Sequence, residues 1–158
     1  MRINRSLFYG IVFVLIAVSA VLIVKFIFAS ENKKILKVIY EGKAAVEAED
    51  VPKCMSHVSL QYLDDYGLRY LVVQRILTEA FKTFDGFKVL LDNIEIEVDS
   101  NKEKAVASFD LRIIVTIQNQ PGYLVGTNDG PAKVRMYFIK ERLKWQVIKV
   151  EGIKAPYM

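Results

Sequence analysis

The first thirty residues contain one long apolar run. Leu7 to Val24 is 18 residues without a charge, and at about 1.5 Å per residue a helix of this length spans about 27 Å. Extension to Phe28 adds about 6 Å and matches a bilayer core of about 30 Å. The run has no polar face, and a signal-peptide cut after Ala20 would leave an apolar start to the mature chain. The pattern therefore predicts an uncleaved transmembrane anchor in residues 1–30 and a separate domain in residues 31–158.

Three segments after the anchor have helical spacing. Residues 31–50 place Ile35, Ile39, Gly42 and Val46 on one face, and this helix is able to continue directly from the membrane helix. A short helix over 51–58 follows, with Asp50 as its cap and Pro52 in its first turn. The third helix is expected over 68–84. Its predicted buried stripe is Leu68, Val72, Ile76, Ala80 and Phe84, broadened by Leu77 and Phe81.

From Phe87 the period of the apolar positions changes to two. It slips at Asp92-Asn93, as a β-bulge would make it do. A long strand over 105–117 follows, then a loop over 118–130 and two strands around 134–138 and 143–147. The expected fold class is α+β: an N-terminal transmembrane helix, then three helices packed on a curved four-stranded antiparallel sheet.

Three short motifs add a family resemblance. They are Ala48-Glu49-Asp50-Val51-Pro52, Tyr62-Leu63-Asp64-Asp65-Tyr66-Gly67 and Lys144-Trp145-Gln146-Val147. With the order of helices and strands, they resemble the nuclear transport factor 2-like superfamily, a cone-shaped α+β fold, over about residues 31–152. The resemblance implies a pocket between helices and sheet, which binds small apolar ligands or transfers protons in some members.

The pocket that the resemblance implies has six candidate residues here: His57, Tyr62, Asp64, Asp65, Tyr66 and Asp85. A buried carboxylate with a raised pKa is able to act as a general base. However, the three aspartates lie beside expected helix ends, where capping explains them, and the inward positions of the long strand are apolar. Catalysis is therefore the less favoured reading, and no catalytic residue is assigned.

The charge and cysteine content give no support for nucleic-acid binding, a zinc site or an internal disulfide. Of the 22 basic residues, three lie in or beside the anchor, and residues 31–158 carry the other 19 with all 18 acidic residues. Net charge therefore gives no argument for nucleic-acid binding. One cysteine, Cys54, and one histidine, His57, cannot form a zinc site or an internal disulfide. No metal and no cofactor are expected.

Arg2 and Arg5 favour a cytoplasmic N-terminus, although lysines also follow the run. The short tail resembles a bacterial signal anchor, so the expected location is the inner membrane with the domain outside it. The basic stretch 133–154 fits phospholipid headgroups, an acidic partner or a solvated strand face.

The second face of the sheet is expected to carry Ile114, Tyr137, Ile139 and Ile148. An apolar strip there suggests a homodimer or a membrane protein partner. The sequence therefore favours a membrane-anchored, non-catalytic binding or assembly module that self-associates through its sheet. The alternative is a small apolar ligand-binding protein, or an enzyme of the isomerase or dehydratase type that uses the pocket.

Overall fold

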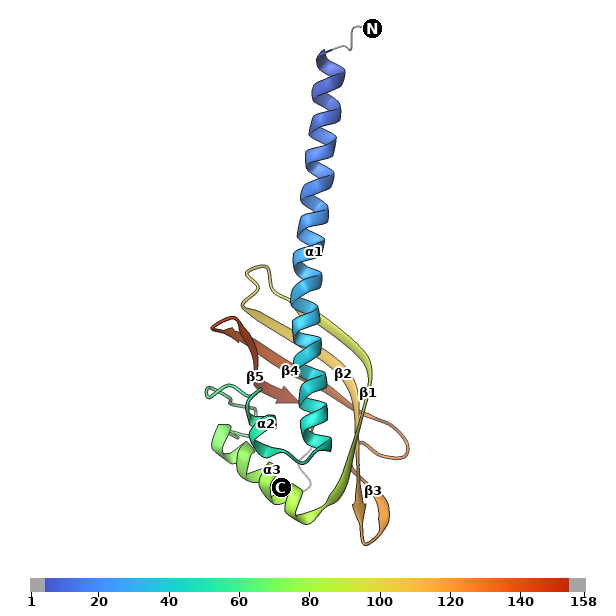
Figure 1. The fold of residues 1–158 in the computed structure, drawn as a ribbon. Helices are drawn as coiled ribbons and strands as arrows, with labels where there is room; N and C mark the ends of the chain where they lie inside the picture. The colour runs from blue at the N-terminus through green and yellow to red at the C-terminus, as the bar shows by residue number, and fades with distance from the viewer. Residues whose placement is uncertain (1–4, 154–158) are drawn as a thin grey trace.

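The fold is a long helix with a curved sheet wrapped around its C-terminal part (Figure 1). In the computed structural model, the backbone is described for residues 5–153 and the side chains for residues 14–19, 22 and 31–153. The helices are α1 (Arg5–Glu47), α2 (Val51–Met55) and α3 (Tyr70–Thr83). The strands are β1 (Asp85–Val98), β2 (Lys104–Ile117), β3 (Gln120–Val125), β4 (Ala132–Glu141) and β5 (Lys144–Glu151).

The predicted anchor lies in the N-terminal half of α1, and most of its side chains, at 7–13, 20–21 and 23–28, lie outside the described residues. Among the residues that are described, no helix is long and apolar enough to cross a membrane. The helix α1 continues unbroken from the apolar run into the domain, which the sequence left open. It ends at Glu47, three residues earlier than predicted, and Glu49 follows with a φ of 55°.

The two shorter helices have the expected positions. Asp50 caps α2 by accepting a hydrogen bond from the Lys53 backbone N–H at 2.9 Å, and Pro52 lies in the first turn. The helix α2 ends at Met55 instead of Val58, because the chain then turns to lie along β5. There the Ser59 N–H donates to the Val147 carbonyl at 2.9 Å.

The sheet has five strands, so the prediction of four is wrong. Its order is β1-β2-β4-β5, and β3 pairs with the part of β2 that extends beyond β4. The missed strand lies in the segment expected to be a loop. Gln118 and Asn119 both adopt positive φ, at 51° and 64°, which is the geometry of a two-residue hairpin turn whose twist suits the strands that it joins. The pair Gln118-Asn119 is a weaker sequence signal for this turn than Asn-Gly.

The predicted bulge in β1 is confirmed. The register with β2 shifts between Asp92 and Glu95, and Asn93 has a φ of 53°. The Asn93 amide donates to Asp110 Oδ2 at 2.8 Å, which holds the extra residue against β2. The bulge adds curvature to the sheet.

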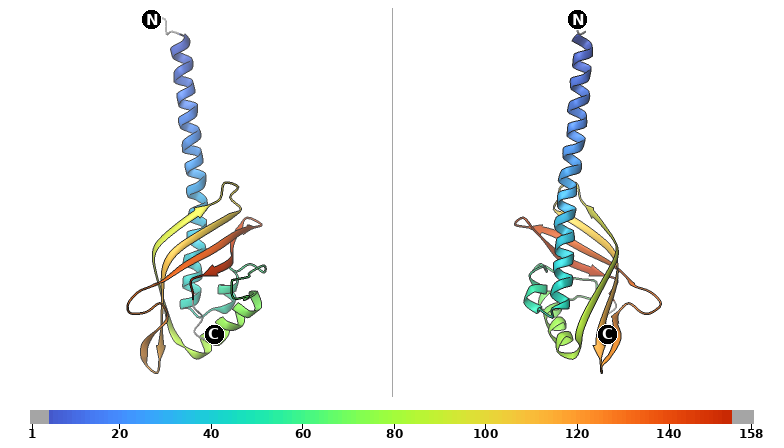
Figure 2. Two further views of the ribbon diagram at one scale, coloured as in Figure 1. Left: turned by 180° about the vertical axis from the view of Figure 1, so that it is seen from behind. Right: turned by 45° about the vertical axis from the view of Figure 1, so that its right-hand side comes forward.

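The hydrophobic core lies between the concave face of the sheet and the last turns of α1 (Figure 2). Ile35 and Ile39 of α1 are buried against Phe109, Phe138 and Trp145 of the strands. The exposed fraction of Trp145 is 3%, which agrees with its predicted inward position.

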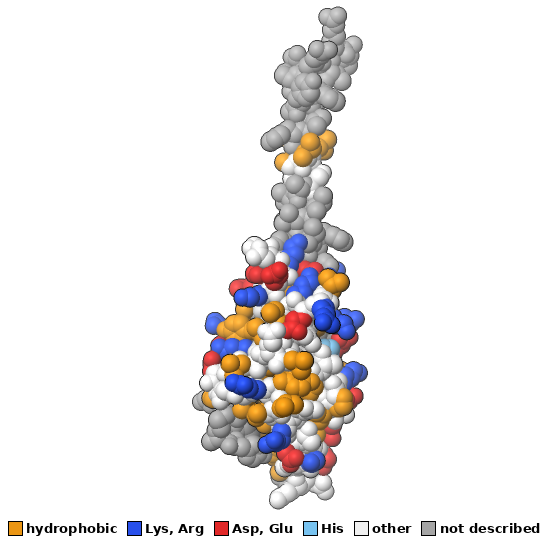
Figure 3. Space-filling view, turned by 90° about the vertical axis from the view of Figure 1, so that its left-hand side faces the viewer, with side chains coloured by type: hydrophobic (Ala, Val, Ile, Leu, Met, Phe, Trp, Pro, Cys, Tyr) orange, Lys and Arg blue, Asp and Glu red, His pale blue; other side chains and the backbone are white. Residues whose placement is uncertain are grey.

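The predicted buried stripe of α3 is wrong in part. Val72 and Ile76 are exposed, and Val73 packs on the core in their place. The helix α3 lies at the end of the sheet, where the Phe81 ring meets Phe87 edge to face at 4.9 Å, so it buries little of its surface. Figure 3 shows hydrophobic side chains among Lys and Arg on this side of the domain.

Candidate functional site

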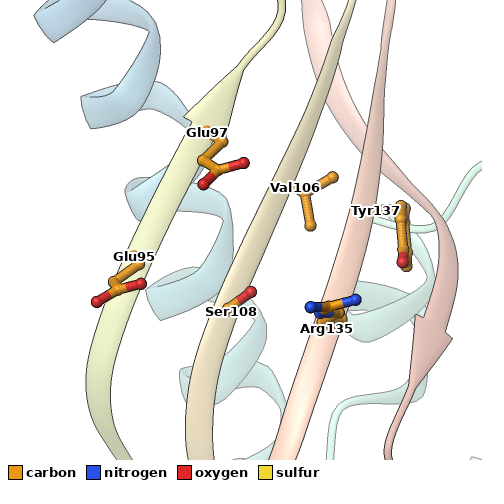
Figure 4. Close-up of a pocket in the computed structure, with 6 residues that line it drawn as sticks. All are labelled: Glu95, Glu97, Val106, Ser108, Arg135 and Tyr137. Carbon is orange, nitrogen blue, oxygen red and sulfur yellow. The ribbon is translucent and has the colours of Figure 1, made fainter.

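The outer face of the sheet, which faces away from α1, carries a shallow open pocket. Its volume is about 240 Å³. It is lined by Glu95 and Glu97 of β1, Val106 and Ser108 of β2, and Arg135 and Tyr137 of β4 (Figure 4). We call these six residues the outer-face pocket.

The strand register explains why these six side chains share a face. Glu95 pairs with Ser108, which pairs with Arg135, and so one row crosses three strands. Glu97, Val106 and Tyr137 form the next row by the same pairing. Side chains of directly opposed residues lie on the same side of a sheet. The core residues Ile96 and Ala107 lie between the two rows and point the other way.

Opposite charges in the pocket are not paired with each other. Glu95 and Glu97 stand on β1, and Arg135 stands on β4 with β2 between them. Within the described part of the chain, none of the three side chains forms a hydrogen bond or an ion pair. The pocket therefore offers an acidic edge and a basic edge to whatever approaches it.

The rim of the pocket is a connected polar network. Tyr137 donates its hydroxyl to Glu151 Oε2 at 2.9 Å, and Lys149 Nζ lies 2.7 Å from both Glu151 Oε1 and Asp65 Oδ1. Hydrogen bonds to the two carboxylates raise the pKa of Lys149 above its ordinary value. Hydrogen bonds from Lys149 and Tyr137 lower the pKa of Glu151. This network fixes the position of the Tyr137 ring.

The predicted interface residues are distributed along the sheet. Tyr137 and Ile139 are neighbours on the outer side of β4, and Tyr137 lines the pocket. Ile114 lies at the other end of β2, opposite Tyr123 of β3. Ile148 is the extra residue where the register between β4 and β5 shifts. The four residues therefore do not form one continuous apolar strip.

The six predicted ligand-pocket residues are brought together only in part: Tyr62, Asp64 and Tyr66 contact one another at one turn. Asp64 Oδ1 accepts from the backbone N–H groups of Tyr66 and Leu68, at 3.0 and 2.9 Å, so it shapes a turn. Asp65 pairs with Lys149. Tyr66 and Asp85 are exposed.

Of the other two predicted pocket residues, Tyr62 contacts the same turn and His57 contacts α1. Tyr62 is buried, and its hydroxyl lies 3.4 Å from Asp64 Oδ2. Burial and the nearby carboxylate raise its pKa. His57 Nε2 lies 3.9 Å from Glu41 Oε2, and burial lowers the pKa of the imidazole. Among the described residues, no group of His, Cys, Asp or Glu side chains has the arrangement of a metal site.

A buried carboxylate that the pattern did not single out lies on the concave side. Glu31 is only 6% exposed. Its Oε2 accepts hydrogen bonds from Trp145 Nε1 at 2.8 Å and Lys140 Nζ at 2.9 Å, and its Oε1 accepts from Lys34 at 2.9 Å. Burial raises the pKa of Glu31, but the three hydrogen bonds outweigh it and lower the pKa to about 2.

The sequence contained weak signals for the buried Glu31 and for the outer-face pocket, neither of which was predicted. Glu31 is the first acidic residue of the chain, and it lies on the same helical face as Ile35. Glu95 and Glu97 alternate with Ile94 and Ile96, so their outward direction was readable. Their relation to Arg135 was not readable, because it depends on which strands are neighbours.

Known structures share this arrangement of elements, while no family model and no curated protein matches the chain. Bd1075 of Bdellovibrio bacteriovorus matches with a TM-score of 0.61 and 13% identity over 75% of this chain, but the match covers only 40% of that protein. An NTF2-like protein with a cystatin-like fold from Novosphingobium aromaticivorans matches with a TM-score of 0.64 and 12% identity, over 82% of this chain and 84% of that one.

A protein from the same organism, described as a candidate scytalone dehydratase, has a TM-score of 0.67 and 11% identity, with 82% of this chain and 95% of that chain covered. At these identities the likeness concerns the fold alone. The helices that precede a curved antiparallel sheet therefore form an NTF2-like, cystatin-like α+β fold.

Proposed function

We propose that this chain is a membrane-anchored, non-catalytic assembly module that self-associates through the outer face of its sheet. The observation that carries the proposal is the unpaired set of opposite charges in the outer-face pocket. Glu95 and Glu97 on β1 and Arg135 on β4 have no partners within the described chain. A second copy supplies both partners, because an interface with two-fold symmetry meets itself.

The geometry of packed sheets supports this proposal. A two-fold axis along the strands, between β2 and β4, sets β2 of one copy against β4 of the other. Arg135 then faces the partner's β2, and the partner's β1 glutamates lie one strand away, at about 4.8 Å. Sheets pack about 10 Å apart, which two long side chains can bridge. Tyr137, Val106 and Ile139 supply the apolar part of the contact.

Sedimentation equilibrium of the full chain in density-matched detergent measures the oligomeric state and tests this proposal. We expect a dimer for the natural chain and a monomer for Ile139→Asp. Arg135→Glu should weaken the dimer at least tenfold, and adding Glu95→Arg should restore much of the loss because opposite charges face each other again. Arg75→Glu on α3 is the matched control. A monomeric natural chain, or equal dimerisation of all variants, contradicts the proposal.

The membrane part of the proposal rests on the uncharged run from Leu7 to Val24. Residues 7–28 act as the anchor, and the domain lies outside a bacterial inner membrane. The full chain should remain with membranes after alkaline extraction, and protease added outside spheroplasts should cleave residues 31–158. Release by alkali would contradict the anchor, and full protection of the domain would contradict the orientation.

The alternative of a pocket enzyme has less support. One structural neighbour is described as a candidate dehydratase, but the acids that would do such chemistry here shape a turn or form an ion pair. The concave face is occupied by Ile35, Phe109 and Phe138. Those contacts favour a structural interior over a substrate chamber.

A further inference from the structure

The tip of the β4–β5 hairpin presents a large apolar side chain between two cations. The turn residues are Arg142 and Leu143, and Lys144 begins β5. Leu143 is 86% exposed. Arg142 and Lys144 are also exposed, and neither side chain forms an ion pair or hydrogen bond within the described part of the chain.

The backbone of this turn is unfavourable for the residues that occupy it. Arg142 has a φ of 47° and Leu143 a φ of 71°, as in the two-residue hairpin turn that favours Asn-Gly. A branched apolar residue with positive φ is strained. A glycine would avoid this cost, and strained residues of this kind cluster at binding sites.

The tip lies at the end of the domain from which the N-terminal part of α1 projects. Figures 1 and 2 show the β4–β5 turn and the β1–β2 turn at this end in three views. The contacts of Glu31 also hold the base of this hairpin against α1. Glu31 binds Lys140, two positions before Arg142, and Trp145, two positions after Leu143.

Two lengths along the backbone limit the distance between the tip and the bilayer. Glu31 is three residues beyond Phe28, the expected end of the span, which is about 4.5 Å along a helix. The tip is two residues beyond the pair bound to Glu31, which is at most about 7 Å along a strand. The headgroup layer of one leaflet is about 5–8 Å thick. Together these lengths put the turn at most about 12 Å from the expected end of the span, so the long side chains of Arg142 and Lys144 extend to that layer.

From these observations we infer that the Arg142-Leu143-Lys144 tip is a second membrane contact, which inserts Leu143 among anionic phospholipid headgroups while Arg142 and Lys144 bind the phosphates. Clusters of cations beside a membrane span attract anionic lipid. The contact orients the domain on the bilayer, with its outer sheet face to the side. The inference rests on the proposed anchor.

The test uses the full chain in vesicles of two parts phosphatidylcholine to one part phosphatidylglycerol. A polarity-sensitive fluorophore is attached at Leu143→Cys or, as a control, at Asn128→Cys in the β3–β4 loop. Cys54 is buried and its thiol pKa is raised to about 11, so labelling at neutral pH is selective for the introduced cysteine. Co-flotation with vesicles measures anchoring, and quenching by spin-labelled lipid measures contact.

We expect the label at position 143 to be quenched several-fold more than the label at 128, and the difference to fall in pure phosphatidylcholine and with Arg142→Gln plus Lys144→Gln. Both substituted residues lack partners, so the domain should fold normally. Equal quenching at 143 and 128 in chains that float overturns the tip contact and leaves the anchor standing. Failure of the natural chain to float overturns the anchor and the tip contact together.

A measurement without a label provides a second check. Leu143→Gly suits the positive φ of the turn, so this variant should keep the fold, as verified by circular dichroism. Amide exchange in residues 141–145 should be several-fold slower in anionic vesicles than in detergent for the natural chain, but equal in both for Leu143→Gly. Identical exchange in the natural chain and the variant contradicts the insertion of Leu143.

Discussion

Trp145 donates its indole N–H to the Glu31 carboxylate at 2.8 Å and thereby joins the start of the sheet's last strand to the point where α1 enters the domain. Both side chains are buried. Lys140 lies 2.9 Å from the same Oε2 atom, and its Nζ stands 5.5 Å from the Trp145 ring centroid. The contact fixes the angle between helix and sheet, so the domain cannot turn freely about α1.

The first prediction concerns pH. The pKa of Glu31 is about 2 in the folded chain, against an ordinary 4.5. Because the folded value is the lower one, the stabilisation is complete above about pH 5 and is lost as pH falls from there toward 2. Glu31→Gln should therefore flatten the fall of Tm between pH 5 and 2. Glu103→Gln, an exposed matched control, should leave the slope unchanged. Parallel slopes for the natural chain and Glu31→Gln would contradict this account.

The second prediction separates the two roles of Trp145. Trp145→Ala removes a buried ring and should destabilise the domain by about 3–5 kcal/mol. Trp145→Phe keeps most of the apolar volume but leaves the Glu31 carboxylate short of one donor, so the loss should be smaller, about 1–3 kcal/mol. Denaturation followed by circular dichroism measures both. A Trp145→Ala midpoint near that of the natural chain would mean that the ring is not part of the core.

The third prediction concerns the free edge of β1. The Val89 backbone N–H donates to Glu47 Oε1 at 2.9 Å, and Lys43 donates to the Val89 carbonyl. Two side chains of α1 thus take the place of a neighbouring strand, which protects an exposed edge from pairing with other chains. Glu47→Ala should cost about 1–3 kcal/mol and speed amide exchange at Val89.

Glu41→Ala on the same helix is the control for this edge. Its carboxylate is 43% exposed and lies 3.7 Å from Lys37, so its loss should cost little. Val89 exchange that is equally fast in the two variants would show that Glu47 does not protect the edge.

The fourth prediction concerns Cys54. Burial and the nearby Asp50 carboxylate raise its thiol pKa from 9 to about 11, which lowers the thiolate fraction at pH 8 about a hundredfold. Alkylation of the folded chain at pH 8 should therefore be at least about a hundredfold slower than in denaturant. Equal rates, followed by mass spectrometry, would mean that the α2 region opens readily.

The local pattern of the sequence was sufficient for most elements. The spacing of Ile35 and Ile39 indicated the buried face of the first helix, the phase slip at Asp92-Asn93 indicated the bulge, and Trp145 was correctly placed inside. These features depend on residues close in the chain, where a period of 3.6 or 2 decides which side is buried. The fold resemblance was also carried by such local order, and the structural neighbours support it.

The errors have a common physical reason. The stripe of α3 was misplaced because Val72 and Val73 are both apolar, and only the position of α3 at the end of the sheet decides which one is covered. The strand β3 was missed because a hairpin of Gln118 and Asn119 depends on a backbone geometry that the neighbouring strands impose.

The sequence by itself determined where the apolar run lies, where the three helices and four of the five strands lie, and which faces of the long strands are buried, because each follows from the chemistry of neighbouring residues. The tertiary structure alone decided which distant residues meet. Glu31 and Trp145, 114 positions apart in the chain, form a hydrogen bond, and Arg135 lies two strands from Glu95. None of the six predicted pocket residues lines the outer-face pocket. Such contacts depend on strand order and helix placement, which packing of the whole chain selects.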